Sequence, residues 1–295
     1  MGKRATTVDE QIGILESRGL HIRDKDKAQE ILQDVGYYRL GFYLFPFEKN
    51  YPNLKYRTHE YKEGATFEDA ISLYYFDFDL RLILSRYLNR IEIAFRTELV
   101  YYLSNKYKDN SIWFADKSVL DKQYVSDFEK KVYNADFRRS SSIRRHHQTY
   151  PNDRFAPAWK TLEFMTFGAI LKLYENLKDK DDKIHIAHKF GVRQVVTFEN
   201  YMHTIRQIRN ACAHGLLLYD LQLPMAIRKG PANLNPSERN NLIGALKVIQ
   251  YIMSYISVNR VKDMEGELAL LYSNLCKKAP FLEPLILDLT ESNNF

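Results

Sequence analysis

Cysteine is scarce in this sequence, and long apolar runs are missing from it. The two cysteines, Cys212 and Cys276, are too few and too far apart to indicate a disulfide framework or a four-ligand zinc site. No uninterrupted apolar run approaches the roughly 20 residues that a membrane-spanning helix needs, and residues 1–7 lack the apolar stretch of a signal peptide. We therefore expect a cytoplasmic protein without a membrane partner.

What the chain does contain is the composition of an ordinary folded protein with two departures. Hydrophobic residues make up 45% and charged residues 27% of the 295 positions, close to the average for globular domains. Aromatic residues are unusually frequent, with 21 Tyr and 17 Phe. The formal net charge of +6 favours a polyanion as partner, because neutralised phosphates supply most of the non-specific affinity for nucleic acids.

Helical periodicity runs through most of the chain, and neither strand-rich regions nor internal repeats are visible. From residue 67 to 107, apolar residues recur every three or four positions, which predicts one long core helix. The sequence thus predicts an all-α fold. Shorter helices are expected over 7–18, 26–35, 121–135, 157–177, 184–190, 193–214, 237–258 and 266–276.

Two segments interrupt this pattern. Residues 36–47 form a dense aromatic block that Pro46 ends; we expect a loop that either packs two subdomains together or stacks unpaired bases, with Arg39 on the phosphates. Residues 138–147 predict an exposed, mobile, basic loop. Such a loop is either solvated or follows an RNA backbone. The arginines expected to bind RNA here are Arg138, Arg139, Arg144, Arg145 and Arg154.

The helix expected over 193–214 has two distinct faces when projected at about 100° per residue. One face is apolar and should be buried. The opposite face is a polar stripe whose side chains could converge on a ligand. The apolar face carries Phe198, Tyr201, Ile205, Ile208, Cys212 and Leu216, and the polar stripe carries His203, Arg206, Asn210 and His214.

Arg209 lies at the border between these two faces. A partly buried guanidinium keeps its charge, and its planar fork matches two phosphate oxygens. A neighbouring imidazole such as His214 can exchange a proton with a ribose 2′-hydroxyl or a leaving oxygen near neutral pH. The alternative is that this spacing arises by chance and that a histidine before Gly215 merely caps the helix end.

Four landmarks carry a resemblance to a known family. They are Gly36-Tyr37-Tyr38-Arg39-Leu40, Tyr75-Phe76-Asp77-Phe78-Asp79-Leu80-Arg81, Ile91-Glu92-Ile93-Ala94-Phe95-Arg96-Thr97 and Arg209-Asn210-Ala211-Cys212-Ala213-His214. Weaker support comes from Trp159-Lys160, Glu163 and Phe167-Gly168. In their order along the chain these landmarks resemble the Abi-like (abortive infection, Abi-2) family, over residues 7–258, and Arg209, Asn210 and His214 match the short motif of the HEPN superfamily.

The resemblance implies an all-α, HEPN-type helical bundle with an N-terminal helical extension that contains the aromatic loop. We expect the extension over 1–65, the HEPN-like domain over 66–262 and a C-terminal helical tail over 263–295. It further implies an RNase of phage defence or a toxin, with a composite site in a homodimer, a 2′,3′-cyclic phosphate product and, for some relatives, a small noncoding RNA that restrains the enzyme. One departure is that Gly215, Leu216 and Leu217 stand where many relatives have a second His and an Arg.

Together these observations predict a metal-independent endoribonuclease that needs no cofactor. Its catalytic residues would be His214 as general base or acid, Arg209 on the scissile phosphate and Asn210 as an orienting group, with Arg206 and His203 binding RNA. Glu92 and Arg96, four residues apart, are expected to form an ion pair and, like Arg81, to give structural support, although Glu92 or Arg96 could also orient the catalytic groups. The alternatives are a non-catalytic RNA-binding or sensing module and a purely structural helical partner protein.

Overall fold

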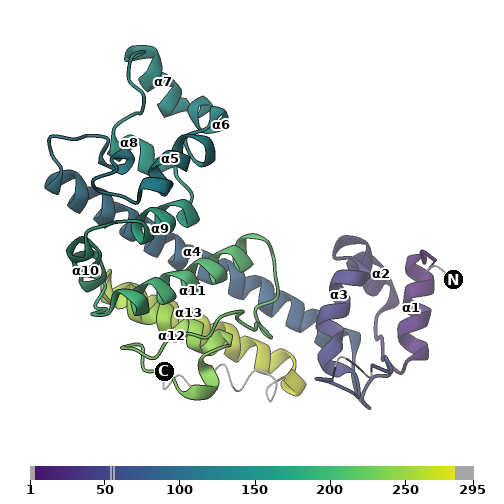
Figure 1. Cartoon of the computed structure of the whole chain (residues 1–295). Coiled ribbons are helices and arrows are strands. Elements are labelled where there is room, and N and C mark those ends of the chain that lie inside the picture. The colour runs from purple at the N-terminus through teal and green to yellow at the C-terminus, as the bar shows by residue number, and fades with distance from the viewer. Residues whose placement is uncertain (1–3, 54, 56, 283–295) are drawn as a thin grey trace. The chain divides into compact units, whose positions relative to one another are not determined.

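The chain is helical throughout the part that the structure describes, as predicted (Figure 1). This computed structural model describes residues 4–53, 55 and 57–282. Across them lie thirteen α-helices and short 3-10 turns, and the only strand-like pairings are isolated bridges such as the one between His21 and Thr66. The prediction of an all-α bundle is confirmed.

The described residues divide into two compact units. The first takes the chain up to Ile83 and from Glu265 onward, and the second is Leu84–Met264. Helices α4 (Phe67–Lys106) and α13 (Val258–Lys278) contribute residues to both. The domain limits expected from the sequence stay a prediction.

The first unit opens with three helices and a 3-10 turn. Thr7 and Glu10 form the expected capping box at the start of α1, with the Thr7 side chain accepting from the Glu10 N–H. The described part of the unit closes with the 3-10 turn η5 (Pro280–Leu282). Its other elements are α1 (Val8–Ser17), α2 (Lys25–Asp34), α3 (Tyr37–Leu44) and η1 (Phe45–Phe47).

The aromatic block was expected to be a loop, and that expectation is wrong. Residues 37–44 form α3, which begins after Gly36 with its φ of +85°. The reason is a helical period within the block, since Leu40, Tyr43, Leu44 and Phe47 are spaced i, i+3, i+4, i+7 and are all buried. These four side chains belong to the core, so they are not available to stack on the bases of an RNA.

Within the first unit, a buried ion pair on α4 is joined to α3 by a tyrosine hydroxyl. Asp77, which is fully buried, contacts Arg81 one turn later, and the Tyr43 hydroxyl donates to Asp77 Oδ2 over 2.8 Å. Burial, with the nearby Asp77 charge, raises the pKa of Tyr43 above its ordinary value, so the hydroxyl stays protonated as a donor. The Asp77 and Arg81 of the second landmark thus have a structural role.

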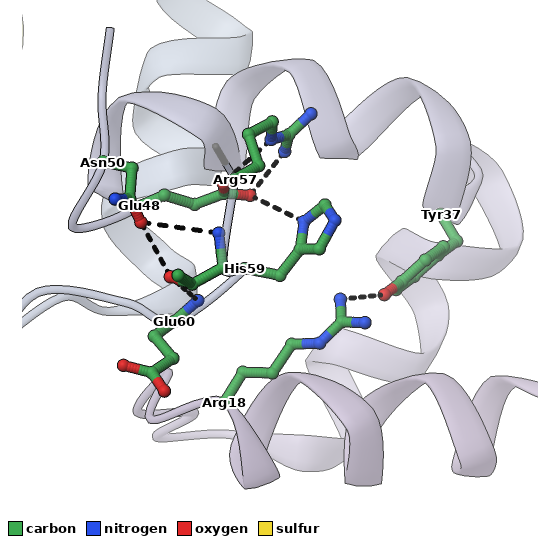
Figure 2. A network of polar contacts seen from close by, with 8 residues as sticks. Arg18, Tyr37, Glu48, Asn50, Arg57, His59 and Glu60 are labelled. Atoms are coloured by element: carbon green, nitrogen blue, oxygen red, sulfur yellow. Dashed lines mark hydrogen bonds and ion pairs between the residues drawn. The ribbon is translucent and has the colours of Figure 1, made fainter. Parts of the chain in front are cut away.

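A second buried carboxylate organises the segment that follows α3 (Figure 2). Glu48 is 1% exposed; it contacts Arg57, whose Nε donates over 2.9 Å, and His59, whose Nδ1 lies 3.3 Å away. The backbone of Glu48 also bridges to Tyr61. The described part of residues 51–64 is therefore mostly a loop tied to one buried acid; residues 54 and 56 lie outside the described residues.

The second unit is built around Phe95, a fully buried ring on α4. Phe95 meets Phe167 and Tyr174 of α9, Phe190 at the end of α10 and Phe198 of α11, with ring centroids 5.7–6.3 Å apart. Such edge-on aromatic contacts add to the free energy gained from burial alone. The helices confined to this unit are α5 (Lys122–Lys131), α6 (Ala135–Arg139), α7 (Ser141–Thr149), α8 (Ala158–Thr161), α9 (Phe167–Glu175), α10 (Lys180–Lys189), α11 (Val195–Ala213) and α12 (Leu242–Ser254).

The basic segment 138–147 is mostly helical, so the expectation of a mobile loop is wrong. It contributes to α6 and α7, which meet at Ser140. The segment has a short amphipathic pattern despite its many charged residues, because Ile143 and His146, three residues apart, are both buried. Its arginines are therefore carried on helices.

Several other helices begin or end differently from the prediction, among them α10 (Lys180–Lys189), expected over 184–190, and α13, expected over 266–276. The single helix expected over 157–177 is interrupted by the 3-10 turn η3 (Leu162–Phe164), after which the Thr166 hydroxyl accepts from the Ala169 N–H and starts α9. Likewise α12 starts at Leu242, where Asn241 is the N-cap. In the described residues no helix combines the length and apolar character that crossing a membrane requires.

The buried Asp77–Arg81 pair generates a stability prediction. Replacing Asp77 by Ala leaves a guanidinium without its carboxylate in a buried position, and we expect a loss of about 3–5 kcal/mol in the free energy of unfolding. Asp79→Ala, an exposed carboxylate two residues away, is the matched control and should change stability by less than about 0.5 kcal/mol. Urea titration followed by circular dichroism measures both, and equal effects would contradict the structural role of Asp77.

Candidate active site

Helix α11 carries the motif that the sequence singled out. Phe198, Tyr201, Ile205 and Ile208 are fully buried, as predicted, and the helix packs against α9, α10 and α12. Leu216 was assigned to the same face but is 56% exposed. The helix ends at Ala213, so residues beyond it no longer follow the helical projection.

His214 is the C-cap of α11, and both His214 and Asn210 are exposed. The backbone N–H of His214 donates to the carbonyl of Asn210 over 2.9 Å. Gly215 follows with a φ of +64°, which turns the chain away from the helix axis. The imidazole of the motif is therefore presented at the end of a rigid helix, in a position open to solvent.

Arg209 forms an ion pair with Glu92 of α4. Its Nε lies 3.4 Å from Glu92 Oε2, and its side chain is 40% exposed, while that of Glu92 is 9% exposed. Arg209 Nη1 also donates to the neighbouring Asn210 Oδ1 over 3.3 Å. Since the carboxylate contacts the inner nitrogen Nε, the outer end of the guanidinium lies on the solvent side, beside Asn210.

The other oxygen of Glu92 binds Arg96, so one carboxylate joins two guanidinium groups. Arg96 Nη2 donates to Glu92 Oε1 over 2.9 Å and to the backbone carbonyl of Met165 over 3.1 Å. The predicted ion pair between Glu92 and Arg96 is thus confirmed. Glu163, in η3, lies 4.0 Å from Arg96 Nη1 but is 64% exposed, so it offsets little of the positive charge.

We call Glu92, Arg96 and Arg209 the arginine cluster. It contains two guanidinium groups for a single buried carboxylate, and the Nε of Arg96 is buried without a hydrogen-bond partner. A site with excess positive charge and an unfilled donor favours an anionic ligand. The half-exposed member, Arg209, is the one that a phosphate can reach.

The remaining members of the polar stripe have different surroundings. His203 is in close contact with Glu175 at the end of α9, so its ring is engaged within the fold. Arg206 lies against Gly168 of α9, where an added Cβ would be 3.5 Å from Arg206 Nη1. In the part of the chain that the structure describes, Arg206 has no ion pair, and its Nε is buried without a partner. Arg206 thus adds a second uncompensated cation beside the motif.

The arginines of the basic segment fall into two groups. Arg138 and Arg154 both bind Glu129, and Arg139 contacts Asp136. Hydrogen bonds from Arg154 and Arg138 lower the pKa of the Glu129 carboxyl, which keeps it ionised. The last two, Arg144 and Arg145, are exposed on α7.

Of the two histidines on α7, His147 contributes little positive charge. Burial, together with the nearby Arg138, lowers the pKa of His147 below its ordinary value. A neutral His147 suits its contact with the Tyr133 hydroxyl, 2.9 Å from its Nε2. In the first unit, Arg39 lies half-buried on α3.

Sequence reasoning missed the partners that fix the polar stripe. Neither Glu175, which contacts His203, nor the Met165 carbonyl, which binds Arg96 of the arginine cluster, was a candidate, because each meets its partner only when the segment from η3 to α9 is packed. The single available signal was the weak landmark around Glu163 and Gly168. Among the described residues no group of three or more His, Cys, Asp or Glu side chains has an arrangement that could hold a metal ion.

The two arginines of the cluster are expected to differ in what they do for stability. Arg96→Ala leaves the buried Glu92 with Arg209 as its remaining partner, and we expect the free energy of unfolding to fall by about 3 kcal/mol. Arg209→Ala removes a half-exposed side chain and should cost no more than about 1 kcal/mol. Thermal and urea unfolding of the two variants compares them; a larger loss for Arg209→Ala would show that Arg209 is a structural residue.

Comparison with known proteins adds the family. The family model described as Abi-like protein matches residues 30–220, which extend from α2 to just past the end of α11 and contain the arginine cluster and His214. No match was found among curated proteins or among solved structures. Because the family model covers well over half of the sequence, the chain belongs to the Abi-like protein family, which points to abortive infection, a form of phage defence.

Proposed function

We propose that this protein is a metal-independent endoribonuclease of the HEPN type that acts in phage defence or as a toxin. The observation that carries the proposal is the contact between the buried carboxylate of Glu92 and Arg209 Nε. It holds a half-exposed guanidinium beside Asn210, and the exposed His214 lies one helical turn beyond Asn210 at the end of the same helix. A phosphate-binding cation and a proton-transfer group are the minimum that RNA cleavage without metal requires.

The chemistry follows from these groups. His214 Nε2 or Nδ1, as general base, takes the proton of a ribose 2′-hydroxyl, and the 2′-oxygen attacks the adjacent phosphorus. The bond from phosphorus to the 5′-oxygen breaks, and that oxygen is protonated as it leaves. The products are a 2′,3′-cyclic phosphate and a 5′-hydroxyl. Arg209 stabilises the extra negative charge on the phosphate oxygens in the transition state.

Glu92 is assigned a positioning role in this scheme. By its ion pair with Arg209 Nε it restricts the rotamers of a long side chain, which lowers the entropy lost when the guanidinium binds a phosphate. Arg206, with no ion pair among the described residues, is free to bind a neighbouring phosphate. Asn210, adjacent to Arg209, orients the guanidinium or the substrate through its amide.

The reaction needs both a base and an acid, and this favours two copies of the chain. Of the two histidines on the polar stripe of the described α11, His203 is engaged by Glu175, which leaves His214 as the exposed imidazole. A second copy that brings its own His214 to the same phosphate would supply the missing proton donor. We therefore propose a homodimer with a composite site, acting in the cytoplasm, with a small noncoding RNA as a possible restraint.

The direct test is cleavage of RNA by purified variants. His214→Ala should lower kcat by about 10²- to 10⁴-fold, the usual contribution of a general acid or base, with an unchanged unfolding curve. His188→Ala, an exposed histidine in the last turn of α10, is the matched control and should cleave at the wild-type rate. If His214→Ala cleaves as fast as the control, the catalytic assignment is wrong.

The competing function is an RNA-binding or sensing module without catalysis. It is favoured by Arg144 and Arg145, which are exposed on α7. In that case, reversing their charge with R144E and R145E would abolish RNA binding and any cellular phenotype, whereas His214→Ala would leave both intact.

Dependence on metal is a separate expectation. Proton transfer by His214 and charge stabilisation by Arg209 need no divalent ion, so cleavage in excess EDTA should proceed at a rate within about twofold of that in magnesium. Gel analysis of a labelled oligoribonucleotide, with identification of the 2′,3′-cyclic end, measures this. Strict dependence on a divalent cation would overturn the proposed metal-independent mechanism, but it would not contradict RNA as the substrate.

A further inference from the structure

Two large aromatic rings are exposed on the segment from α8 to η3, whose end contacts the arginine cluster. Trp159, on α8, is 54% exposed, and Phe164, in η3, is 43% exposed. Most aromatic rings of this unit lie in the core, including the fully buried Trp113 and Phe95. Within the described residues neither Trp159 nor Phe164 packs against another aromatic ring, so packing with a ring does not account for their positions.

The position of Phe164 relative to the arginine cluster is fixed by its two neighbours in the chain. Glu163 Oε1 lies 4.0 Å from Arg96 Nη1, and the carbonyl of Met165 accepts from Arg96 Nη2 over 3.1 Å. Arg96 shares Glu92 with Arg209. Phe164 is therefore the exposed ring between two residues that touch the cluster.

Trp159 belongs to the same short helical segment. It lies five residues before Phe164, and α8 (Ala158–Thr161) passes directly into η3 (Leu162–Phe164). The half-buried Lys160 is adjacent to Trp159. The segment from α8 to η3 thus presents two rings and a cation at the edge of a site that has excess positive charge.

We propose that Trp159 and Phe164 form a stacking platform for unpaired bases of an RNA whose phosphate is bound by Arg209. This inference rests on the proposed function and specifies the form of its substrate. Every base has a flat π face, and an indole or phenyl ring is a general partner for it, whereas a paired duplex hides these faces. In proteins that bind single strands, arginines typically bind the phosphates while the bases stack on nearby aromatic rings.

An alternative occupant, an apolar protein surface, fits the surroundings less well. The rings are flanked by Lys160 and by the arginine cluster, whose two guanidinium groups share one buried carboxylate. A partner that buried them would have to neutralise these cations as well as cover the rings. Single-stranded RNA meets both requirements, because each nucleotide carries a phosphate that neutralises a cation and a base that covers a ring.

The chain offers an internal probe, because it contains only two tryptophans, Trp113 and Trp159. Trp113 is fully buried, so a ligand that stacks on the surface reaches Trp159 alone. The experiment uses the cleavage-deficient His214→Ala protein and an unstructured oligoribonucleotide of mixed sequence. We expect the RNA to quench tryptophan fluorescence, polyphosphate of similar charge to leave it unchanged, and W159F in the same background to remove the response.

The kinetic arm uses the wild-type His214 background. Trp159→Ala and Phe164→Ala should each raise KM for a single-stranded substrate by roughly tenfold, within the range that stacking of one base supports. The kcat should change by less than about twofold, and W159F should retain most of the affinity. Tyr101→Ala is the matched control, since Tyr101 is 68% exposed on α4 and carries no role in the site.

The outcomes separate this inference from the nuclease proposal. RNA-specific quenching together with a raised KM supports the platform. Quenching without any cleavage by the wild type also supports it and removes only the nuclease. Cleavage by the wild type with no quenching, and with unchanged KM in Trp159→Ala and Phe164→Ala, overturns the platform and leaves the nuclease standing. If RNA neither binds nor is cleaved, both proposals fall.

Discussion

The buried ring of Phe95 is the contact on which the site depends. It lies between Glu92 and Arg96 in the sequence, and it packs against rings from α9, the end of α10, and α11. Because a close-packed core tolerates little displacement, this packing fixes how α4 lies against α11. Glu92 then reaches Arg209, and Arg96 reaches the carbonyl of Met165. An apolar contact thereby sets the geometry of a polar site.

A buried carboxylate serves two guanidinium groups at the centre of this arrangement. Glu92 pairs over 2.9 Å with Arg96, which is almost buried, and over 3.4 Å with Arg209, whose side chain is 40% exposed. The same acid therefore stabilises the fold through one arginine and positions the other for a ligand. The first unit uses a similar device without the exposed partner, since Asp77 contacts the buried Arg81 and accepts from Tyr43.

Local sequence signals were reliable where a single helix explains them. The capping box of Thr7 and Glu10, the long α4 and the buried face of α11 all follow from spacing within one element. The predictions of loops were wrong in two segments whose composition obscured the helical spacing of their buried residues. In the segment of α6 and α7, charged residues masked the buried pair Ile143 and His146, and in the aromatic block the rings masked the period that makes α3.

By itself the sequence determined the helical class and the identity of the motif on α11, because both depend on periodicity within a few turns. It also indicated that Arg209 would be partly buried, since that follows from its angle on one helix. Tertiary structure alone decided that Glu92 would meet Arg209, that His203 would be engaged by Glu175, and that Trp159 and Phe164 would stay exposed near the cluster. These contacts join residues that are 28 or more positions apart in different helices, and no local pattern encodes a contact that arises only when the core is packed.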